Sequence, residues 1–343
     1  MKSDVTQQMT ASSSHRLAGT AALLLALCAI SCSETRNFGS SHPHGLLPVD
    51  ERNPILLTND GVYDNWQGEY AILLASSGGP RLAGIVVGTS PNLTKIDDNV
   101  TGWRGLVKAA HDSGLSDIPE PTASIGAKLE RPASGQFEDT TPNRSEGARL
   151  ILELSKQLSL PYRPLVVVTG GRLTDVADAF LIDPTVTART VVVSSLGSVT
   201  ATGGAMADPN GEMDPWADAI VTSRFRFVQV SAFYDQLLDV PASRFSELPA
   251  NPLGQWIQAK QPEVWDLPKA ADQVAVLAVG DPDFAVEVDR VSAGPVAANA
   301  TSGPELTSRL DGAAWLVKRC DGAKAAERFW QALNALPVSG PAH

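Results

Sequence analysis

Short apolar runs alternate along the chain with longer stretches whose apolar residues recur at helical spacing. The runs lie at residues 55–57, 82–88, 164–168 and 190–193 and consist mainly of Val, Ile and Leu. Unbroken apolar runs of this length are typical of strands that are buried on both faces, as in a parallel sheet. Helical spacing falls between them, for example at residues 95–113 and 145–158. The pattern therefore predicts an α/β domain with an open, mostly parallel sheet flanked by helices.

The later part of the chain continues this pattern with shorter elements. Residues 224–230 alternate between polar and apolar and predict a further strand. Residues 284–292 and 294–300 predict a small closing β-hairpin, and residues 313–335 predict an amphipathic C-terminal helix. Residues 118–147 are rich in Pro, Ser, Thr, Gly and Asn, so this long connection is either a functional loop or partly disordered.

A polar turn follows the first predicted strand. It contains Thr58, Asn59, Asp60, Asp64 and Asn65, and a helical pattern begins after it. In an open α/β sheet, ligands usually bind at the carboxyl ends of the strands. If water is excluded from such a turn, its carboxylates repel one another and its amides lack hydrogen-bond partners. A bound cation removes this cost, and so does exposure of the turn to solvent. The turn is therefore either a cation site or a solvated loop whose Asp and Asn side chains cap the helix.

The first residues have the features of a bacterial lipoprotein signal peptide. His15 and Arg16 precede an apolar run at residues 17–27. This run is shorter than the about 20 apolar residues that a transmembrane helix needs. The run leads into Ala-Ile-Ser-Cys32, which resembles a lipobox whose Cys is lipidated, although ordinary signal cleavage nearby is the alternative. A hydrophilic stretch follows, with the composition of a flexible tether. The expected parts are a signal peptide, a tether and a folded domain at residues 1–31, 32–50 and 51–340.

Composition and charge narrow the class of protein. The chain is 43% hydrophobic, which supports a sizeable core, and its net charge is −11. Such acidity argues against nucleic-acid binding, which needs a basic surface. Of the three Cys, Cys28 and Cys32 belong to the expected leader, so Cys320 is left without a disulfide partner in the folded domain and is interpreted as a packing residue. Lipidation at Cys32 would anchor the protein in the bacterial cell envelope, on its periplasmic side or at the cell surface.

The stretch at residues 54–75 resembles the N-terminal signature of the inosine-uridine-preferring nucleoside hydrolase family. That signature is a strand followed by Asp-x-Asp-x-Gly-x-Asp-Asp and a helix. Thr58, Asp60, Asp64 and Asn65 stand at its four Asp positions, so two of the four acids are kept. The resemblance extends to about residue 336. It implies a Rossmann-like, nucleoside hydrolase-like sheet.

Two later segments resemble the parts of the family that complete a calcium site. Residues 172–177 resemble Gly-x-Leu-Thr-Asn-Ile-Ala, which places Gly170 at the residue whose backbone carbonyl binds Ca²⁺. Asp272 falls on the third carboxylate ligand, while Ala271 replaces a His that assists the leaving base. The resemblance therefore implies Ca²⁺ as the cofactor. Its predicted ligands are Asp60, Asp64, Asn65, Gly170 and Asp272.

The positions expected to bind the sugar match the family's residues less well than the predicted calcium ligands do. Thr89 stands at the Asn that follows the second strand, and Asn92 is its nearest replacement. Glu212 and Asp214 match the Glu and Asn of Ala-Glu-Phe-Asn. Asp214-Pro215 is also a strong helix start, with Asp as N-cap and Pro at the first helical position. The sequence leaves both roles open for Asp214.

The resemblance implies an exported enzyme that hydrolyses an N-ribosyl or related glycosidic bond with the help of Ca²⁺, with Asp60 activating water. Its partner would be a small nucleoside or sugar-like substrate, and family members are often homo-oligomers. Departures at Thr58, Asn65, Thr89 and Ala271 favour the alternative of a degenerate sugar-binding lipoprotein. No donor for the leaving base is evident, since His111 is more simply a surface or packing residue. A purely structural lipoprotein is a more distant alternative.

Overall fold

The computed structural model describes residues 47–61, 67–91, 93–195, 198–199, 205–206, 209–230, 246–260, 272–298 and 303–337. The expected signal peptide, most of the tether and Cys32 lie outside these residues. The strands of the main sheet are β1 (Ile55–Asn59), β2 (Leu82–Val87), β3 (Pro121–Ala123), β4 (Leu165–Thr169), β5 (Thr190–Ser194), β8 (Arg226–Val230), β9 (Ala285–Ala293), β10 (Leu306–Ser308) and β11 (Ala314–Cys320). A separate antiparallel pair consists of β6 (Ser198–Val199) and β7 (Ala205–Met206).

Helices connect most of these strands. The α-helices are α2 (Gln67–Ser76), α3 (Ile96–Asp112), α4 (Glu146–Leu158), α5 (Thr174–Ile182), α6 (Pro209–Met213), α7 (Pro215–Arg224), α8 (Pro252–Lys260), α9 (Gln273–Gly280) and α10 (Gly322–Asn334). Short 3₁₀ turns lie at η1 (Phe137–Asp139), η2 (Pro184–Ala188) and η5 (Pro282–Phe284). Among the described residues, no helix is both long enough and apolar enough to cross a membrane.

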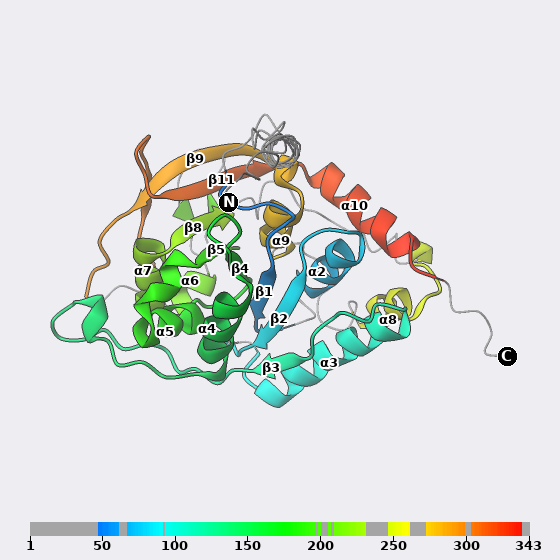
Figure 1. Cartoon of the computed structure of the whole chain (residues 1–343), viewed down its shortest axis with the longest axis horizontal. Helices are drawn as coiled ribbons and strands as arrows, with labels where there is room; N and C mark the ends of the chain where they lie inside the picture. Colours follow the sequence, from blue (N-terminus) through cyan, green and yellow to red (C-terminus); the bar gives the residue numbers. More distant parts are fainter. Residues whose placement is uncertain are drawn as a thin grey trace, which may run out of the picture. The chain divides into compact units, whose positions relative to one another are not determined.

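The sheet is open and mostly parallel, as predicted. Its strand order is β10-β9-β11-β8-β5-β4-β1-β2-β3 (Figure 1). The strands from β3 to β11 are parallel, and β9 and β10 add antiparallel pairs at one edge. The chain moves outward from β1 to β3 and then returns to place β4 on the other side of β1. This reversal is the topological switch point at which open α/β sheets bind ligands.

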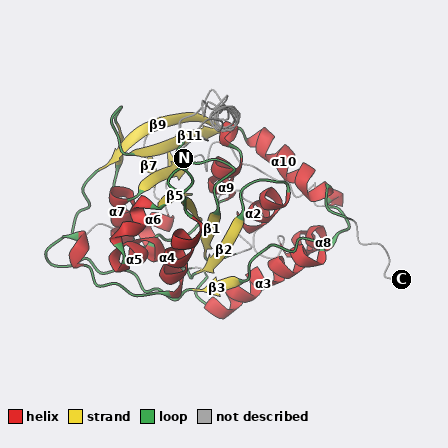
Figure 2. Cartoon of the chain, in the orientation of Figure 1, coloured by secondary structure: helices red, strands yellow, loops and turns green. Residues whose placement is uncertain are grey.

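Burial on both faces explains the unbroken apolar runs. Every residue of β1, β4 and β5 is buried. Alternate side chains point to opposite faces, so Ile55 and Leu57 enter one core while Leu56 enters the other. Helices cover both faces of the sheet (Figure 2). One core includes residues of α2, α3, α8, α9 and α10, and the other includes residues of α4, α5 and α7.

Close helix packing depends on a small residue at the α2–α3 contact. A Cβ on Gly68 would lie 2.6 Å from an atom of the Trp103 ring and 2.7 Å from a methyl carbon of Leu106. Trp103 is fully buried, so its ring has no free space into which to move. Gly68 therefore lets α2, which follows the polar turn, pack directly against α3.

The connection at residues 118–147 is ordered and contains β3 and η1. Asn143 donates from its side chain to the carbonyl of Ala127 at 2.5 Å, and the backbone N–H of Leu129 donates to Asp214. Ser145 then caps α4 by accepting a hydrogen bond from the N–H of Ala148. Of the two alternatives left open by the sequence, partial disorder does not describe this segment, which has defined structure and contacts.

The C-terminal elements differ from the prediction. β9 pairs with β11 and β10, whereas residues 294–298 form no strand. Residues 314–320, predicted to be helical, form β11 between β8 and β9. The helix begins only at Gly322, where the Asp321 side chain accepts a hydrogen bond from the N–H of Lys324. This segment is a strand because it pairs with strands on both sides. Its local apolar pattern does not show that such partners exist.

Candidate functional site

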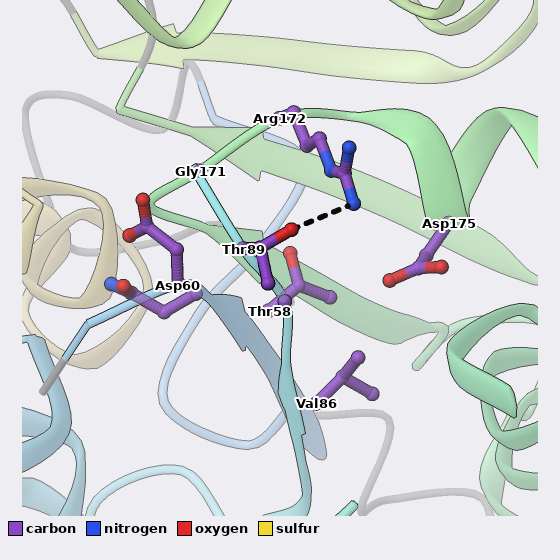
Figure 3. A pocket seen from close by; sticks show the side chains of 9 residues that line it. Thr58, Asp60, Val86, Thr89, Gly171, Arg172 and Asp175 are labelled. Atoms are coloured by element: carbon purple, nitrogen blue, oxygen red, sulfur yellow. Dashed lines mark hydrogen bonds between the residues drawn. The ribbon is translucent and has the colours of Figure 1, made fainter. Parts of the chain in front are cut away.

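A small pocket opens at the switch point (Figure 3). The segments after β1, β2 and β4 meet there because the carboxyl ends of parallel strands share one edge of the sheet. Its lining residues are Thr58, Asn59, Asp60, Val86, Gly88, Thr89, Gly171, Arg172 and Asp175. The polar turn predicted from sequence is therefore part of a pocket.

Asp60 is buried, with 7% of its surface exposed. The backbone N–H of Gly61 donates to Asp60 Oδ1 at 2.8 Å and to Asn59 Oδ1 at 3.1 Å. These bonds hold the turn that ends β1 and fix the Asp60 carboxylate in the pocket. A positioned carboxylate of this kind can accept a proton from a bound water.

A second group of polar residues lies beside Asp60. The Asn59 side chain donates to Gln67 Oε1 at 2.7 Å and lies 3.4 Å from Asp272 Oδ2. A Cβ on Gly170 would lie 2.6 Å from both Asn59 Nδ2 and Asp272 Cβ. The fold thus brings Gly170 and Asp272, 102 positions apart in the chain, against the turn that holds Asp60.

The chemistry of these groups fits part of a calcium site. Asp60 and Asp272 carry the hard carboxylate oxygens that Ca²⁺ prefers, and only glycine fits between Asn59 and Asp272 at position 170. Asp64 and Asn65, the other predicted ligands, lie outside the described residues. Within the described part of the chain, no cluster of three His, Cys, Asp or Glu residues is arranged to hold a metal. The calcium site therefore stays a prediction.

The residues predicted to bind sugar are separated by the fold. Thr89 lines the pocket, and its Oγ1 accepts a hydrogen bond of 3.4 Å from Arg172 Nη2. Glu212 is exposed on the short helix α6. Asn92 lies outside the described residues. Of the predicted sugar contacts that are described, Thr89 alone is among the pocket's lining residues.

Asp214 is the N-cap of α7, the alternative left open by the sequence. Its Oδ1 accepts from the N–H of Ala217 at 3.1 Å. Its Oδ2 accepts from the N–H of Leu129 at 2.9 Å and from the Thr174 hydroxyl at 2.7 Å. Burial raises the pKa of this carboxyl, against the effect of these hydrogen bonds. Asp214 is not among the residues that line the pocket.

Two charged pocket residues were not singled out by sequence reasoning, Arg172 and Asp175. Asp175 Oδ1 accepts from the Ser124 hydroxyl at 2.7 Å. Burial raises the pKa of Asp175, while hydrogen bonds from Ser124 and Ser145 and the charge of Arg172 oppose that shift. Their place directly after the Gly170-Gly171 turn, at the end of a buried strand, was the signal that could have identified them.

Two further positions bear on the chemistry. Thr58, at the family's first Asp, is buried, and its hydroxyl has no hydrogen-bond partner among the described residues. His111 is exposed at the end of α3, with Nε2 3.0 Å from the carbonyl of Ile118, and does not line the pocket. His111 is therefore not placed to assist a leaving group in this pocket.

Comparison with solved structures identifies the fold. The chain is similar to an inosine-guanosine nucleoside hydrolase, at a TM-score of 0.63 and 14% identity over 82% of this chain and 99% of that one. It is also similar to an inosine-uridine preferring nucleoside hydrolase from Bacillus anthracis, at a TM-score of 0.61 and 14% identity over 82% of this chain and 99% of that one. A purine-preferring ribonucleoside hydrolase from Gardnerella vaginalis matches at a TM-score of 0.56 and 16% identity over 81% of this chain and 98% of that one. No protein-family model and no curated protein sequence matches the chain. The protein therefore has a nucleoside hydrolase-like fold, with its pocket at the switch point of the sheet.

Proposed function

We propose that the protein hydrolyses the N-ribosyl bond of a nucleoside, or a related glycosidic bond, with Asp60 activating the attacking water. One observation carries this proposal. Asp60 is a buried carboxylate at the carboxyl end of β1, held by the N–H of Gly61 inside the pocket of a nucleoside hydrolase-like fold.

The reaction requires three tasks of this pocket. The ribose must be held, a water must lose a proton as it attacks the anomeric carbon, and the base must leave with its bonding electrons and gain a proton. Asp60 takes the proton of the water, and Asn59 and Gly61 hold the turn on which Asp60 lies. The residues that would hold Ca²⁺ are Asp60, Asp64, Asn65, the carbonyl of Gly170 and Asp272. When bound there, the ion would supply electrostatic stabilisation for the ribose hydroxyls and the attacking water.

A catalytically inactive sugar-binding protein is the second candidate. The observation that favours it is Thr58, whose buried hydroxyl replaces a family carboxylate and lacks a described hydrogen-bond partner. A pocket with less negative charge would still bind a ribosyl group through hydroxyls and amides. It would activate water less strongly.

Release of reducing sugar separates these candidates. Purified chain is incubated with purine and pyrimidine nucleosides in the presence of Ca²⁺ or of a chelator. We expect Asp60→Asn to lower the rate by about 10²–10⁴-fold, the usual contribution of a general base. Asp112→Asn is the matched control, because Asp112 is an exposed carboxylate paired with Lys108 on α3. No sugar release by the wild type, with ribose still stabilising it against heat, would select the binding protein.

We also propose that the chain is exported and lipid-anchored through Cys32, because a short apolar run leads into Ala-Ile-Ser-Cys32. The mature protein in the membrane fraction should then carry the mass of a lipid on an N-terminal Cys. Cys32→Ala should remove that mass and release the protein from the membrane fraction. An unmodified N-terminus elsewhere would indicate ordinary signal cleavage instead.

A further inference from the structure

Arg172 is the one positively charged residue among those that line the described pocket. It lies on the turn between β4 and α5 and is partly buried. Its side chain extends toward Thr89, with Asp60 and Asp175 to either side in the view (Figure 3). The pocket is therefore not uniformly acidic, since a guanidinium group lies beside the Thr89 hydroxyl.

The guanidinium of Arg172 has little to bind in the described part of the chain. Its one hydrogen bond there runs from Nη2 to Thr89 Oγ1 at 3.4 Å, near the limit for such a bond. Asp175 lines the same pocket and feels the charge of Arg172, but no ion pair within 4.0 Å joins Arg172 to a carboxylate of the described residues. An arginine has five N–H donors in a planar fork, so most of its donors remain available to a ligand.

A neutral nucleoside offers no charged partner to this partly buried guanidinium. The ribose hydroxyls and the base are uncharged, while a guanidinium that loses water to a ligand gains most from an anion that accepts two hydrogen bonds. Phosphate presents three acceptor oxygens, which suits Arg172 together with the Thr89 hydroxyl beside it. Thr58 also lines this pocket, but its hydroxyl oxygen is buried and the phosphate contacts proposed below do not use it.

We propose that this pocket binds a phosphorylated ribosyl compound, with Arg172 and Thr89 holding the phosphate of the sugar while Asp60 faces the anomeric carbon. This inference rests on the proposed N-ribosyl site and names its substrate class. Arg172 acts as a specificity residue, because it distinguishes a sugar phosphate from the free sugar. It takes no part in the transfer of protons.

Binding of ribose and of ribose 5-phosphate to the full chain tests the proposal by calorimetry, with Ca²⁺ present. The wild type should bind ribose 5-phosphate more tightly than ribose. Arg172→Gln should weaken ribose 5-phosphate binding by about tenfold or more, the effect of losing charge-assisted hydrogen bonds, and should leave ribose binding nearly unchanged. Arg172→Lys, which keeps the charge without the fork, should give an intermediate loss. Arg149→Gln, an exposed change on α4, is the matched control and should bind as the wild type does.

Several results would overturn the proposal. Equal affinity of the wild type for the two sugars is one, and no binding of either is another. A third is an equal loss of both in Arg172→Gln, which would indicate a general contact to sugar or base. Inorganic phosphate that binds as tightly as ribose 5-phosphate would show an anion site unconnected to the sugar. These are binding measurements, so they can succeed even where the hydrolysis test with Asp60→Asn fails, and the two failures are distinguishable.

Discussion

Asp214→Ala is expected to be one of the most destabilising single changes in this chain. Asp214 is 1% exposed and connects three segments, because its two oxygens accept hydrogen bonds from α7, from the N-terminal end of α5 and from the connection at Leu129. Alanine would remove the acceptor and leave the three donors in place.

The magnitude follows from these contacts. Loss of an Asp N-cap costs about 1 kcal/mol. The N–H of Leu129 and the hydroxyl of Thr174 would each become a buried donor without an acceptor, at about 1–3 kcal/mol apiece. The free energy of unfolding should therefore fall by about 3–7 kcal/mol, a large part of the usual stability of a domain.

Urea unfolding followed by tryptophan fluorescence measures this change. Asp321→Ala is the matched control, since Asp321 caps α10 through a single hydrogen bond to the N–H of Lys324 on the exposed surface. It should cost about 1 kcal/mol. Equal losses for the two variants would refute the view that the buried contacts of Asp214 hold the three segments together.

The pH dependence of a milder variant provides a second test. Burial raises the pKa of Asp214 above its ordinary value of 3.8. A carboxyl with a raised folded-state pKa stabilises the fold most below its unfolded pKa, and that contribution falls as the pH rises through the folded-state value. Asp214→Asn lacks this titration, so its destabilisation relative to the wild type should be largest in acid and should shrink toward neutral pH. A difference that grows with pH would contradict the sign of the shift.

Three further changes probe the packing and the site. Gly68→Ala should destabilise the domain by about 1–3 kcal/mol in a urea titration, because the new Cβ would lie 2.6 Å from the ring of Trp103; a neutral effect would mean that α2 shifts freely. Cys320 should resist a thiol reagent in the native state at mildly alkaline pH and react fully in urea, because burial raises the pKa of its thiol; rapid native labelling would contradict its burial. Gly170→Ala should abolish any thermal stabilisation by Ca²⁺, since its Cβ would displace Asn59 or Asp272; unchanged Ca²⁺ stabilisation would separate this turn from the metal site.

Local pattern determined the elements whose residues are buried on both faces or capped by their neighbours. Residues 55–57, 164–168 and 190–193 had to form interior strands because no polar face is available to solvent. Ser145 and Asp214 each cap a helix that begins directly after them. The pattern predicted a helix from residue 145, and Asp214-Pro215 favoured a helix start while leaving a sugar contact open for Asp214. The open, mostly parallel sheet was predictable for the same reason, and the resemblance around Asp60 implied its nucleoside hydrolase-like form.

Tertiary structure decided what depends on contacts between distant segments. Residues 314–320 became a strand because β8 and β9 offered hydrogen bonds on both sides. One pocket contains Arg172, Thr89 and Asp175 because β2 and β4 lie on either side of β1. This strand order arises where the chain reverses direction across the sheet, at the switch point. The Asp214 carboxylate accepts hydrogen bonds from Leu129 and Thr174, which lie 85 and 40 positions away in the sequence. The amino-acid sequence by itself determined which side chains were available, and the long-range strand order decided which of them could contact one ligand.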